Sequence, residues 1–281
     1  MVTPGTLFVV ATPLGNLGDL SPRAAETLRT VDTVAAEDTR RTKGLLSSID
    51  AHPRLVSYHA HSDDRRSESL IAILTEGRNV ALVTDAGTPA ISDPGHLLVA
   101  AARRAGVPVV PVAGPSAVAA ALSASGLAGD RYLFLGFIPR KGRERKELLA
   151  RAAIEPWSVV FFEAPGRLAA LLADLKDGAG SERIVVVARE LTKLHEEFRR
   201  GTTAELAAWY LDEPVRGEVT VILAGCPPGH GSPPPPDPAE VIALIRAHLA
   251  AGESRKDTVR MVTARYGLSR NDAYRLVTDE P

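Results

Sequence analysis

The stretch NVALVTDAGTPAISDPG, residues 79–95, joins a short apolar, β-branched run to twelve small, polar and conformationally special residues. The run NVALV predicts a buried strand. The following TDAGTPAISDPG is poor core material, because Gly87 can take positive φ while Pro89 and Pro94 stiffen the path. It is either a surface turn or a surface where backbone approaches a ligand, and the rest of the chain bears on that choice.

Short apolar runs of this kind recur along the chain, with apolar helical segments between most of them. Strands that alternate with helices predict an α/β fold with largely parallel sheets. Nine strands would be many for one sheet, so we expect two sheets in two domains. The predicted strands are 6–11, 32–37, 54–59, 79–84, 107–112, 131–138, 157–163, 183–190 and 217–225.

The order of these segments predicts four parts. An N-terminal α/β domain covers 1–113 and a C-terminal α/β domain covers 114–226. The segment 227–237 is a Pro-rich linker, because its four consecutive prolines favour extended polyproline II. Residues 238–281 show apolar residues at helical spacing and predict a small helical domain that resembles a helix–turn–helix.

Composition narrows the classes of protein. The chain has 281 residues, 45% of them hydrophobic, and a net charge of −1, so no global attraction to nucleic acid is visible. No apolar run approaches the ~18–20 residues that span a membrane, and the N-terminus lacks a basic signal-peptide region. The single cysteine, Cys226, excludes an internal disulfide framework and a cysteine zinc site. We therefore expect a cytoplasmic protein and predict no metal site.

Three further loops share the position and character of the first. ATPLGNLGDL (11–20), AEDTRRTK (36–43) and VAGPSAVAA (112–120) each follow a predicted strand. In open α/β sheets ligands bind outside the carboxyl ends of the strands, so four such loops at one edge favour a ligand site over plain turns. The sequence has no G-x-G-x-x-G after the first strand, no P-loop and no G-x-S-x-G elbow, which disfavours ordinary dehydrogenases, P-loop enzymes and α/β-hydrolases.

The second half adds two clusters of ionisable residues. VVFFEAPGRL (159–168) and VVARELTKLHEEFRRGT (186–202) each read as a strand followed by charged groups. A solvated loop explains charges alone. A strand end that concentrates acids, a lysine and a histidine is also where general acid–base chemistry is built.

Six motifs taken in order resemble the tetrapyrrole methylase superfamily, and within it the enzymes that methylate small-subunit ribosomal RNA. They are ATPLGNLGDLSPRA, AAEDTRRT, TDAGTPAISDPG, VAGPSAVAAALSASGL, FFEAPGRL and ARELTKLHEEFRRGT, between Thr6 and Gly225. The tail 238–278 resembles the small helical domain that ends many members. One departure is Gly166, where the family pattern has His.

This resemblance implies two α/β domains with S-adenosylmethionine in a cleft between them, and a homodimer. It implies 2′-O-methylation of a cytidine ribose in the decoding region of 16S ribosomal RNA, within the small ribosomal subunit. Carried over by position, the cofactor pocket would comprise Pro13, Leu14, Gly15, Asp85, Gly87, Thr88, Ile91, Ser116, Ala117, Phe162, Glu163, Glu190 and Glu218.

The catalytic groups stay open at the level of sequence. A ribose 2′-hydroxyl is weakly acidic, so a base or a cation should help it react. The candidates are Glu37, Asp38 and Arg40 in the first domain, and Lys193, His195 and Glu196 in the second. Lys193 could stabilise the developing oxyanion, could accept the proton if burial lowers its pKa, or could simply pair with Glu190 or Glu196.

Two alternative functions remain. The first is another activity of the same superfamily, on a precorrin-like tetrapyrrole or a diphthamide precursor. Precorrin enzymes usually show a G-x-G-P-G first loop, where this chain has TPLGNLGD. The second is a nucleic-acid-binding regulator that uses the basic tail, but no base-reading side chains are identifiable there.

Overall fold

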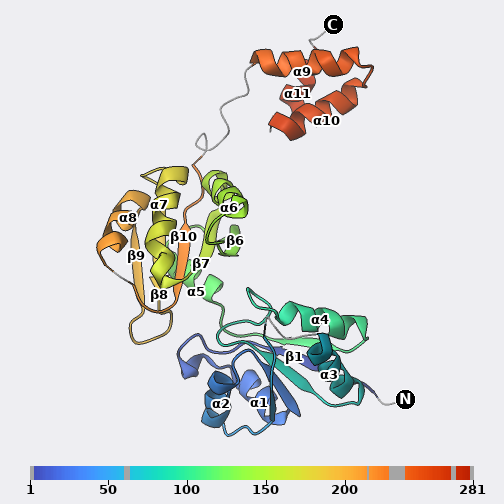
Figure 1. Ribbon diagram of the computed structural model, residues 1–281, viewed down its shortest axis with the longest axis vertical. Coiled ribbons are helices and arrows are strands. Elements are labelled where there is room, and N and C mark those ends of the chain that lie inside the picture. Colours follow the sequence, from blue (N-terminus) through green and yellow to red (C-terminus); the bar gives the residue numbers. More distant parts are fainter. Residues whose placement is uncertain (1–2, 60–63, 214, 228–237, 267–269, 279–281) are drawn as a thin grey trace. The chain divides into compact units, whose positions relative to one another are not determined.

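The computed structural model describes residues 3–59, 64–213, 215–227, 238–266 and 270–278. The chain forms two compact units, Met1–Cys226 and Pro227–Pro281 (Figure 1). The first unit contains two sheets and the second is helical. The predicted α/β fold with two sheets and a helical C-terminal part is therefore confirmed.

The first sheet is fully parallel, with strand order β3-β2-β4-β1-β5. Its strands are β1 (Leu7–Val10), β2 (Thr33–Ala36), β3 (Arg54–Ser57), β4 (Val80–Val83) and β5 (Val109–Val112). One face packs against α1 (Pro22–Thr30) and α2 (Thr39–Ser48), and the other against α3 (Asp64–Thr75) and α4 (Gly95–Arg104). Both faces are thus buried, as the near-continuous apolar strands require.

The second sheet has strand order β6-β7-β10-β8-β9 and is mixed. Its strands are β6 (Tyr132–Phe137), β7 (Ser158–Glu163), β8 (Ile184–Arg189), β9 (Glu197–Thr202) and β10 (Val219–Leu223). Only β6 and β7 run parallel, while β10 is antiparallel to β7 and β8, and β8 to β9. The prediction of largely parallel sheets is therefore wrong here. A hairpin reverses the chain between β8 and β9, and β10 then lies between β7 and β8 and runs antiparallel to both, although α6, α7 and α8 connect the other strands.

Strand β9 is absent from the predicted set. Its sequence EFRRGT is charged, and we had assigned it to a cluster of ionisable loop residues. The strand forms because it lies at the edge of the sheet, where its charged side chains remain partly exposed. Edge strands lack the apolar pattern on which the prediction depended.

Helices cover both faces of the second sheet. Helix α5 (Ala117–Ser125) packs on one face, together with Leu14 from the loop after β1. Helices α6 (Arg143–Ile154), α7 (Leu168–Ala179) and α8 (Thr203–Asp212) cover the other. Two short 3₁₀ helices, Leu17–Asp19 and Pro165–Arg167, lie in the loops after β1 and β7. The loop after β1 thus contributes to the packing of the second sheet.

The C-terminal unit is a set of three helices with its own core. They are α9 (Pro238–Ala250), α10 (Arg255–Tyr266) and α11 (Arg270–Thr278). Their buried residues are Val241, Ile245, Val259, Val262, Ala273 and Val277. Apart from Pro227, the predicted linker 227–237 lies outside the described residues, and the four domain limits stay predictions. No helix in the described part of the chain is both long and apolar enough to span a membrane.

Candidate functional site

Four loops meet at the carboxyl edge of the first sheet. They follow β2, β4, β1 and β5, which are consecutive in that sheet. The loops after β1 and β4 are joined by paired backbone hydrogen bonds between Thr12 and Gly87, at 2.9 and 3.0 Å. Asp85 accepts from the Asp38 amide at 2.9 Å, and Thr84 donates to Glu37 at 2.8 Å. The four loops therefore form one hydrogen-bonded rim, as their positions after parallel strands predict.

A cavity of about 370 Å³ lies against this rim and extends to the second sheet. Its volume falls in the range of pockets that hold small molecules and cofactors. Eight of the predicted site residues line it: Leu14, Glu37, Asp85, Ile91, Ala117, Phe162, Glu163 and Glu218. The structure thus brings residues from four loops and two sheets around one space.

The other predicted cofactor residues do not line the cavity. Gly87 takes a φ of +84° and pairs with Thr12, and Thr88 donates to the Pro115 carbonyl at 3.0 Å. Ser116 caps α5, where its hydroxyl accepts from the Ala119 amide. These contacts shape the loops around the cavity. Pro13, Gly15 and Glu190 are likewise outside the lining.

The apolar part of the cavity is unusually open. Ile91 and Phe137 are about half exposed, at 48% and 56%, although both are large apolar side chains. The Phe137 ring lies 5.6 Å from that of Phe162, centroid to centroid. Apolar side chains that face an open cavity are typical of a ligand site.

Carboxylates supply the polar part. Burial, with the charge of Glu37, raises the pKa of Asp85 despite the opposing hydrogen bond from the Asp38 amide. Asp93 accepts from the Gly95 amide at 2.7 Å with one oxygen, while its buried Oδ2 has no hydrogen-bond partner among the described residues. A buried acceptor without a partner is costly, so the Asp93 oxygen is suited to a ligand N–H or O–H.

Strained backbone concentrates in two loops, one after β4 and one after β8. Among the described residues, five non-glycine residues have positive φ. Ala90 and Ser92, at 69° and 64°, belong to the loop after β4, and Glu190 and Thr192, at 51° and 64°, to the loop after β8. Such conformations cost about 1–3 kcal/mol each and cluster at functional sites.

Lys193 bridges the two halves of the unit. Its Nζ donates to Glu190 at 2.8 Å and to Glu218 at 3.2 Å, and its chain packs over Gly15, where an added Cβ would lie 2.2 Å from Lys193 Cγ. Burial opposes the charge of Lys193, but the hydrogen bond from Lys193 to Glu190 and the carboxylate of Glu218 outweigh it, so its pKa is raised. Lys193 therefore stays an ammonium, which argues against the proton-accepting role considered from the sequence.

The remaining catalytic candidates lie outside the cavity. Asp38 is the N-cap of α2, and its hydrogen bonds from Arg40 hold its pKa at about 2. The Arg40 side chain is 90% exposed and pairs only with Asp38 in the described structure. His195 and Glu196 are exposed in the loop between β8 and β9, where Glu196 accepts from the Thr192 amide at 2.5 Å.

Sequence reasoning missed eleven residues of the lining, and three of them bring a charge or an exposed aromatic ring to the cavity. Arg41 lies 3.6 Å from Asp85 and places a positive charge at the rim. Asp93 lies in the quoted loop, and its position directly before Pro94 and the start of α4 was the available signal, but it was not among the predicted site residues. Phe137 ends β6, and nothing in its own segment indicates that it faces the first domain's loops.

Within the described residues, no three histidine, cysteine or acidic side chains gather where they could hold a metal ion. The lining of the cavity itself combines carboxylates, one arginine, hydroxyl groups and apolar side chains.

Comparison with known proteins identifies the family. Residues 6–207 match the Tetrapyrrole (Corrin/Porphyrin) Methylases. The chain belongs to the tetrapyrrole methylase family. The match spans all four loops and strands β6 to β9, and it contains every lining residue of the cavity except Gly217, Glu218, Val219 and Thr220.

Three similar proteins define the relationship. A protein of Synechocystis sp. named Ribosomal RNA small subunit methyltransferase I is 44% identical over 97% of both chains. A protein of Xylella fastidiosa with the same name is 48% identical over 91% of this chain and 94% of its own. The solved structure of uroporphyrin-III C-methyl transferase from Thermus thermophilus, complexed with S-adenyl homocysteine, is similar with a TM-score of 0.59 and 20% identity. The similarity covers 78% of this chain and 97% of the other. The last similarity concerns the fold alone.

Against this family background, the departure at Gly166 is local. Gly166 lies in the 3₁₀ helix Pro165–Arg167, is exposed, and has open space where a Cβ would be. Its neighbour Pro165 lines the cavity, but Gly166 does not. In this tetrapyrrole methylase the position therefore contributes no side chain to the cavity.

Proposed function

We propose that the protein transfers the methyl group of S-adenosylmethionine to the 2′-hydroxyl of a cytidine ribose in the decoding region of 16S ribosomal RNA. The observation that carries this proposal is the end-to-end similarity to relatives named for the RNA of the small subunit, at 44% identity over 97% of both chains. The cavity supplies the chemistry that such a reaction needs.

The residues of the cavity suit a methyl donor with an adenosine and an amino-acid part. Leu14, Ile91 and Phe162 offer apolar surface to a base, and Asp85 and Asp93 offer carboxylate oxygens to hydroxyl or ammonium donors. The sulfonium of the donor supplies an electrophilic methyl group. The protein has to hold an attacking oxygen in line with that group and keep the two close together. Such positioning can lower the activation free energy by several kcal/mol.

Proton transfer falls to the carboxylates. Glu37 and Asp85 both line the cavity, and the strands that they follow, β2 and β4, are neighbours in the sheet. Either carboxylate can receive the proton of the attacking hydroxyl. Lys193 remains charged and would stabilise the negative charge that develops on the ribose oxygen. Arg40 would hold an adjacent phosphate, because its exposed guanidinium can make bidentate contacts.

Four features belong to the same proposal. The protein acts as a homodimer, in the cytoplasm, on RNA within the small ribosomal subunit. The predicted division at 1–113, 114–226, 227–237 and 238–281 assigns the donor cavity to the two α/β domains and RNA docking to the helical domain.

The decisive experiment is methyl transfer from radiolabelled S-adenosylmethionine to isolated small ribosomal subunits, with naked 16S RNA in parallel. Nucleoside analysis of the product should find the label in 2′-O-methylcytidine. A reaction with uroporphyrinogen but not with either RNA would favour the tetrapyrrole alternative. Specific retention of duplex DNA without methyl transfer would favour a regulator. Label on a base would contradict the proposed position.

A further inference from the structure

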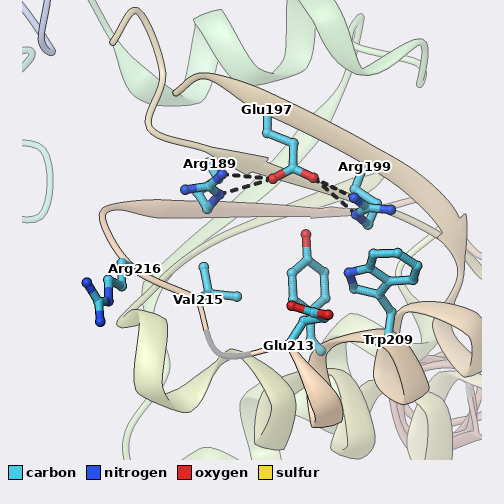
Figure 2. A pocket seen from close by; sticks show the side chains of 8 residues that line it. Arg189, Glu197, Arg199, Trp209, Glu213, Val215 and Arg216 are labelled. Atoms are coloured by element: carbon cyan, nitrogen blue, oxygen red, sulfur yellow. Dashed lines mark hydrogen bonds and ion pairs between the residues drawn. The ribbon is translucent and has the colours of Figure 1, made fainter. Parts of the chain in front are cut away.

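A second cavity, of about 300 Å³, lies in the second sheet, on the face covered by α7 and α8. Arg189 at the end of β8 and Arg199 on β9 line it, with Trp209 and Tyr210 from α8. Glu197 lies between the two arginines in Figure 2. Glu213, Val215 and Arg216 complete the lining. Three arginines and two glutamates leave the cavity with a net positive charge.

The two inner arginines keep donors available for a ligand. Glu197 Oε2 accepts from Nε and Nη2 of Arg189, and its Oε1 accepts from Nε and Nη2 of Arg199. In the described structure the Nη1 groups of both arginines make no hydrogen bond. One carboxylate thus fixes two guanidinium groups, and each still has N–H groups that an anion can use.

Trp209 forms a flat platform with one of these arginines. The Arg199 guanidinium carbon lies over the Trp209 ring, 4.0 Å from its centroid, in a cation–π contact. The indole is nevertheless 48% exposed. An exposed aromatic face beside arginine is the arrangement on which nucleic-acid bases stack, at about 1–3 kcal/mol per base.

A buried hydroxyl in the lining also lacks an acceptor. Tyr210 is only 6% exposed, and its hydroxyl lies beside the Arg199 guanidinium, which is a donor, so its own O–H has no acceptor within the described residues. Burial and the charge of Glu197 raise its pKa, so the hydroxyl remains a protonated donor. An unsatisfied buried donor costs about 1–3 kcal/mol, which a ligand acceptor would recover.

We propose that this second cavity binds one nucleotide unit of a single-stranded RNA, with its base on Trp209 and its phosphate between Arg189 and Arg216. Arg216 is exposed and forms no ion pair with the described residues, so its charge is available to a phosphate. The volume is at the low end for small-ligand sites and fits one nucleotide rather than a peptide segment.

The position of the cavity favours RNA that is also the substrate. Arg189 precedes Glu190, the partner of Lys193, and Arg216 precedes Gly217 and Glu218, which line the donor cavity. Two short chain segments therefore connect the two cavities. The two cavities lie on opposite faces of the second sheet, so in this proposal a nucleotide further along the substrate RNA occupies the second cavity. In this respect the inference rests on the proposed function.

Fluorescence offers a direct test, because the chain has two tryptophans, Trp157 and Trp209. Trp157→Phe leaves Trp209 as the reporter, and Trp209→Phe leaves Trp157, which has a similar exposure and its own arginine over the ring, Arg131. We expect a single-stranded RNA hexamer containing cytidine to quench Trp209 saturably and to leave Trp157 unchanged. Hexamer binding without a change at Trp209 would overturn the proposal.

Affinity measurements provide a second test of the proposal. Arg199→Ala and Arg216→Ala should each weaken hexamer binding about tenfold, whereas Arg131→Ala should not. Arg216→Ala should also reduce, by about one unit, the slope of the logarithm of the binding constant against the logarithm of the salt concentration. Equal affinities for all three variants would overturn the proposal. Melting temperature and donor binding serve as folding controls.

The proposed reaction and the proposed RNA site can be disproved independently of each other. Quenching at Trp209 with no methyl transfer to small subunits would remove the proposed reaction and keep the RNA site. Full methyl transfer by Arg199→Ala and Arg216→Ala, at unchanged KM for RNA, would remove the RNA site and keep the reaction.

Discussion

Asp85 shows how a single residue combines stability and function at this site. Its carboxylate accepts from the Asp38 amide and lies 3.6 Å from Arg41, yet burial still raises its pKa. A raised pKa in an acid means that the ionised form is disfavoured in the folded protein. Asp85 is therefore retained at some cost to stability, which suits a residue whose carboxylate meets a ligand.

Replacement of Asp85 should separate these effects. Asp85→Asn keeps a side-chain oxygen that can accept a hydrogen bond and removes the charge. Asp85→Ala removes both the acceptor and the charge. We expect Asp85→Ala to weaken donor binding by about 1–3 kcal/mol, the usual cost of a lost hydrogen bond to a charged group. Calorimetric titration with S-adenosylmethionine measures this. An unchanged dissociation constant would assign Asp85 to the structure of the loop instead.

The sign of the pH dependence follows from the raised pKa. Because the folded-state pKa of Asp85 lies above its unfolded value of 3.8, the folded protein binds this proton more tightly. Ionisation of Asp85 thus destabilises the fold as pH rises through the raised pKa. Asp85→Asn should melt no lower than the wild type at pH 7, and its advantage should shrink as the pH falls through that range. A difference independent of pH would contradict this account.

Lys193 gives a second prediction at the residue scale. Lys193→Ala leaves Glu190, whose side chain is 19% exposed, without its ion-pair partner, so we expect a loss of about 1 kcal/mol in stability. The rate of methyl transfer at saturating RNA and donor should fall by more than this loss of stability explains. Lys193→Arg is the matched control that keeps the charge. A proportionate loss of activity and folded protein would show a structural role alone.

Sequence reasoning worked best for residues that follow a strand directly. Asp85 was predicted because it directly follows an apolar run, whereas Leu14 and Ile91 were carried over by position from the family resemblance. All three line the cavity. Arg41 was not assigned, because it lies inside a helix whose rotation the sequence does not reveal. Phe137 was missed for a similar reason, since the contact depends on how two separate sheets meet.

At the scale of elements, the connection before β10 determines the geometry around Lys193. Sequence placed Glu190 and Glu218 in separate strands, and only the antiparallel pairing of β8 with β10 brings them together. The same pairing was not predictable, because no short turn joins the two strands. Strand β9 was hidden by its charge, since Glu197 and Arg199 satisfy each other on the sheet rather than in solvent.

Gly217 is the residue on which that connection depends. It has a φ of +89°, and a Cβ there would lie 2.2 Å from Glu190 Oε1. Gly217→Ala should therefore add a steric conflict to the ordinary cost of about 1–2 kcal/mol for a left-handed residue. We expect a lower melting temperature and a lower rate of methyl transfer, because displacement of Glu190 also displaces Lys193.

Gly106 provides the control for this prediction. It also has positive φ, at 71°, but no atom within 4 Å of its Cβ position. Gly106→Ala should cost only the backbone strain and leave methyl transfer by the folded protein unchanged. Thermal melting and single-turnover transfer for both variants test the argument, and equal effects of the two substitutions would refute the contact between Gly217 and Glu190.

At the scale of the whole molecule, the chain divides into Met1–Cys226 and Pro227–Pro281. The composition indicated this division, because a run of prolines cannot extend either core. The donor cavity lies wholly within the first unit, and the second has its own apolar core. We therefore expect the first unit to fold without the second.

Truncation after Pro227 tests this separation. The shortened protein should remain folded, because none of the buried residues of either sheet is removed. Its affinity for S-adenosylmethionine should match that of the full chain, since every lining residue of the donor cavity is retained. Methyl transfer to small subunits should fall at limiting subunit concentration, through a higher KM, because basic residues of the helical unit such as Arg260 and Arg265 are lost. Transfer should recover in part at saturating subunits. Methyl transfer at the full rate under limiting subunits would exclude the helical unit from RNA docking, and loss of donor binding would show that the two units depend on each other.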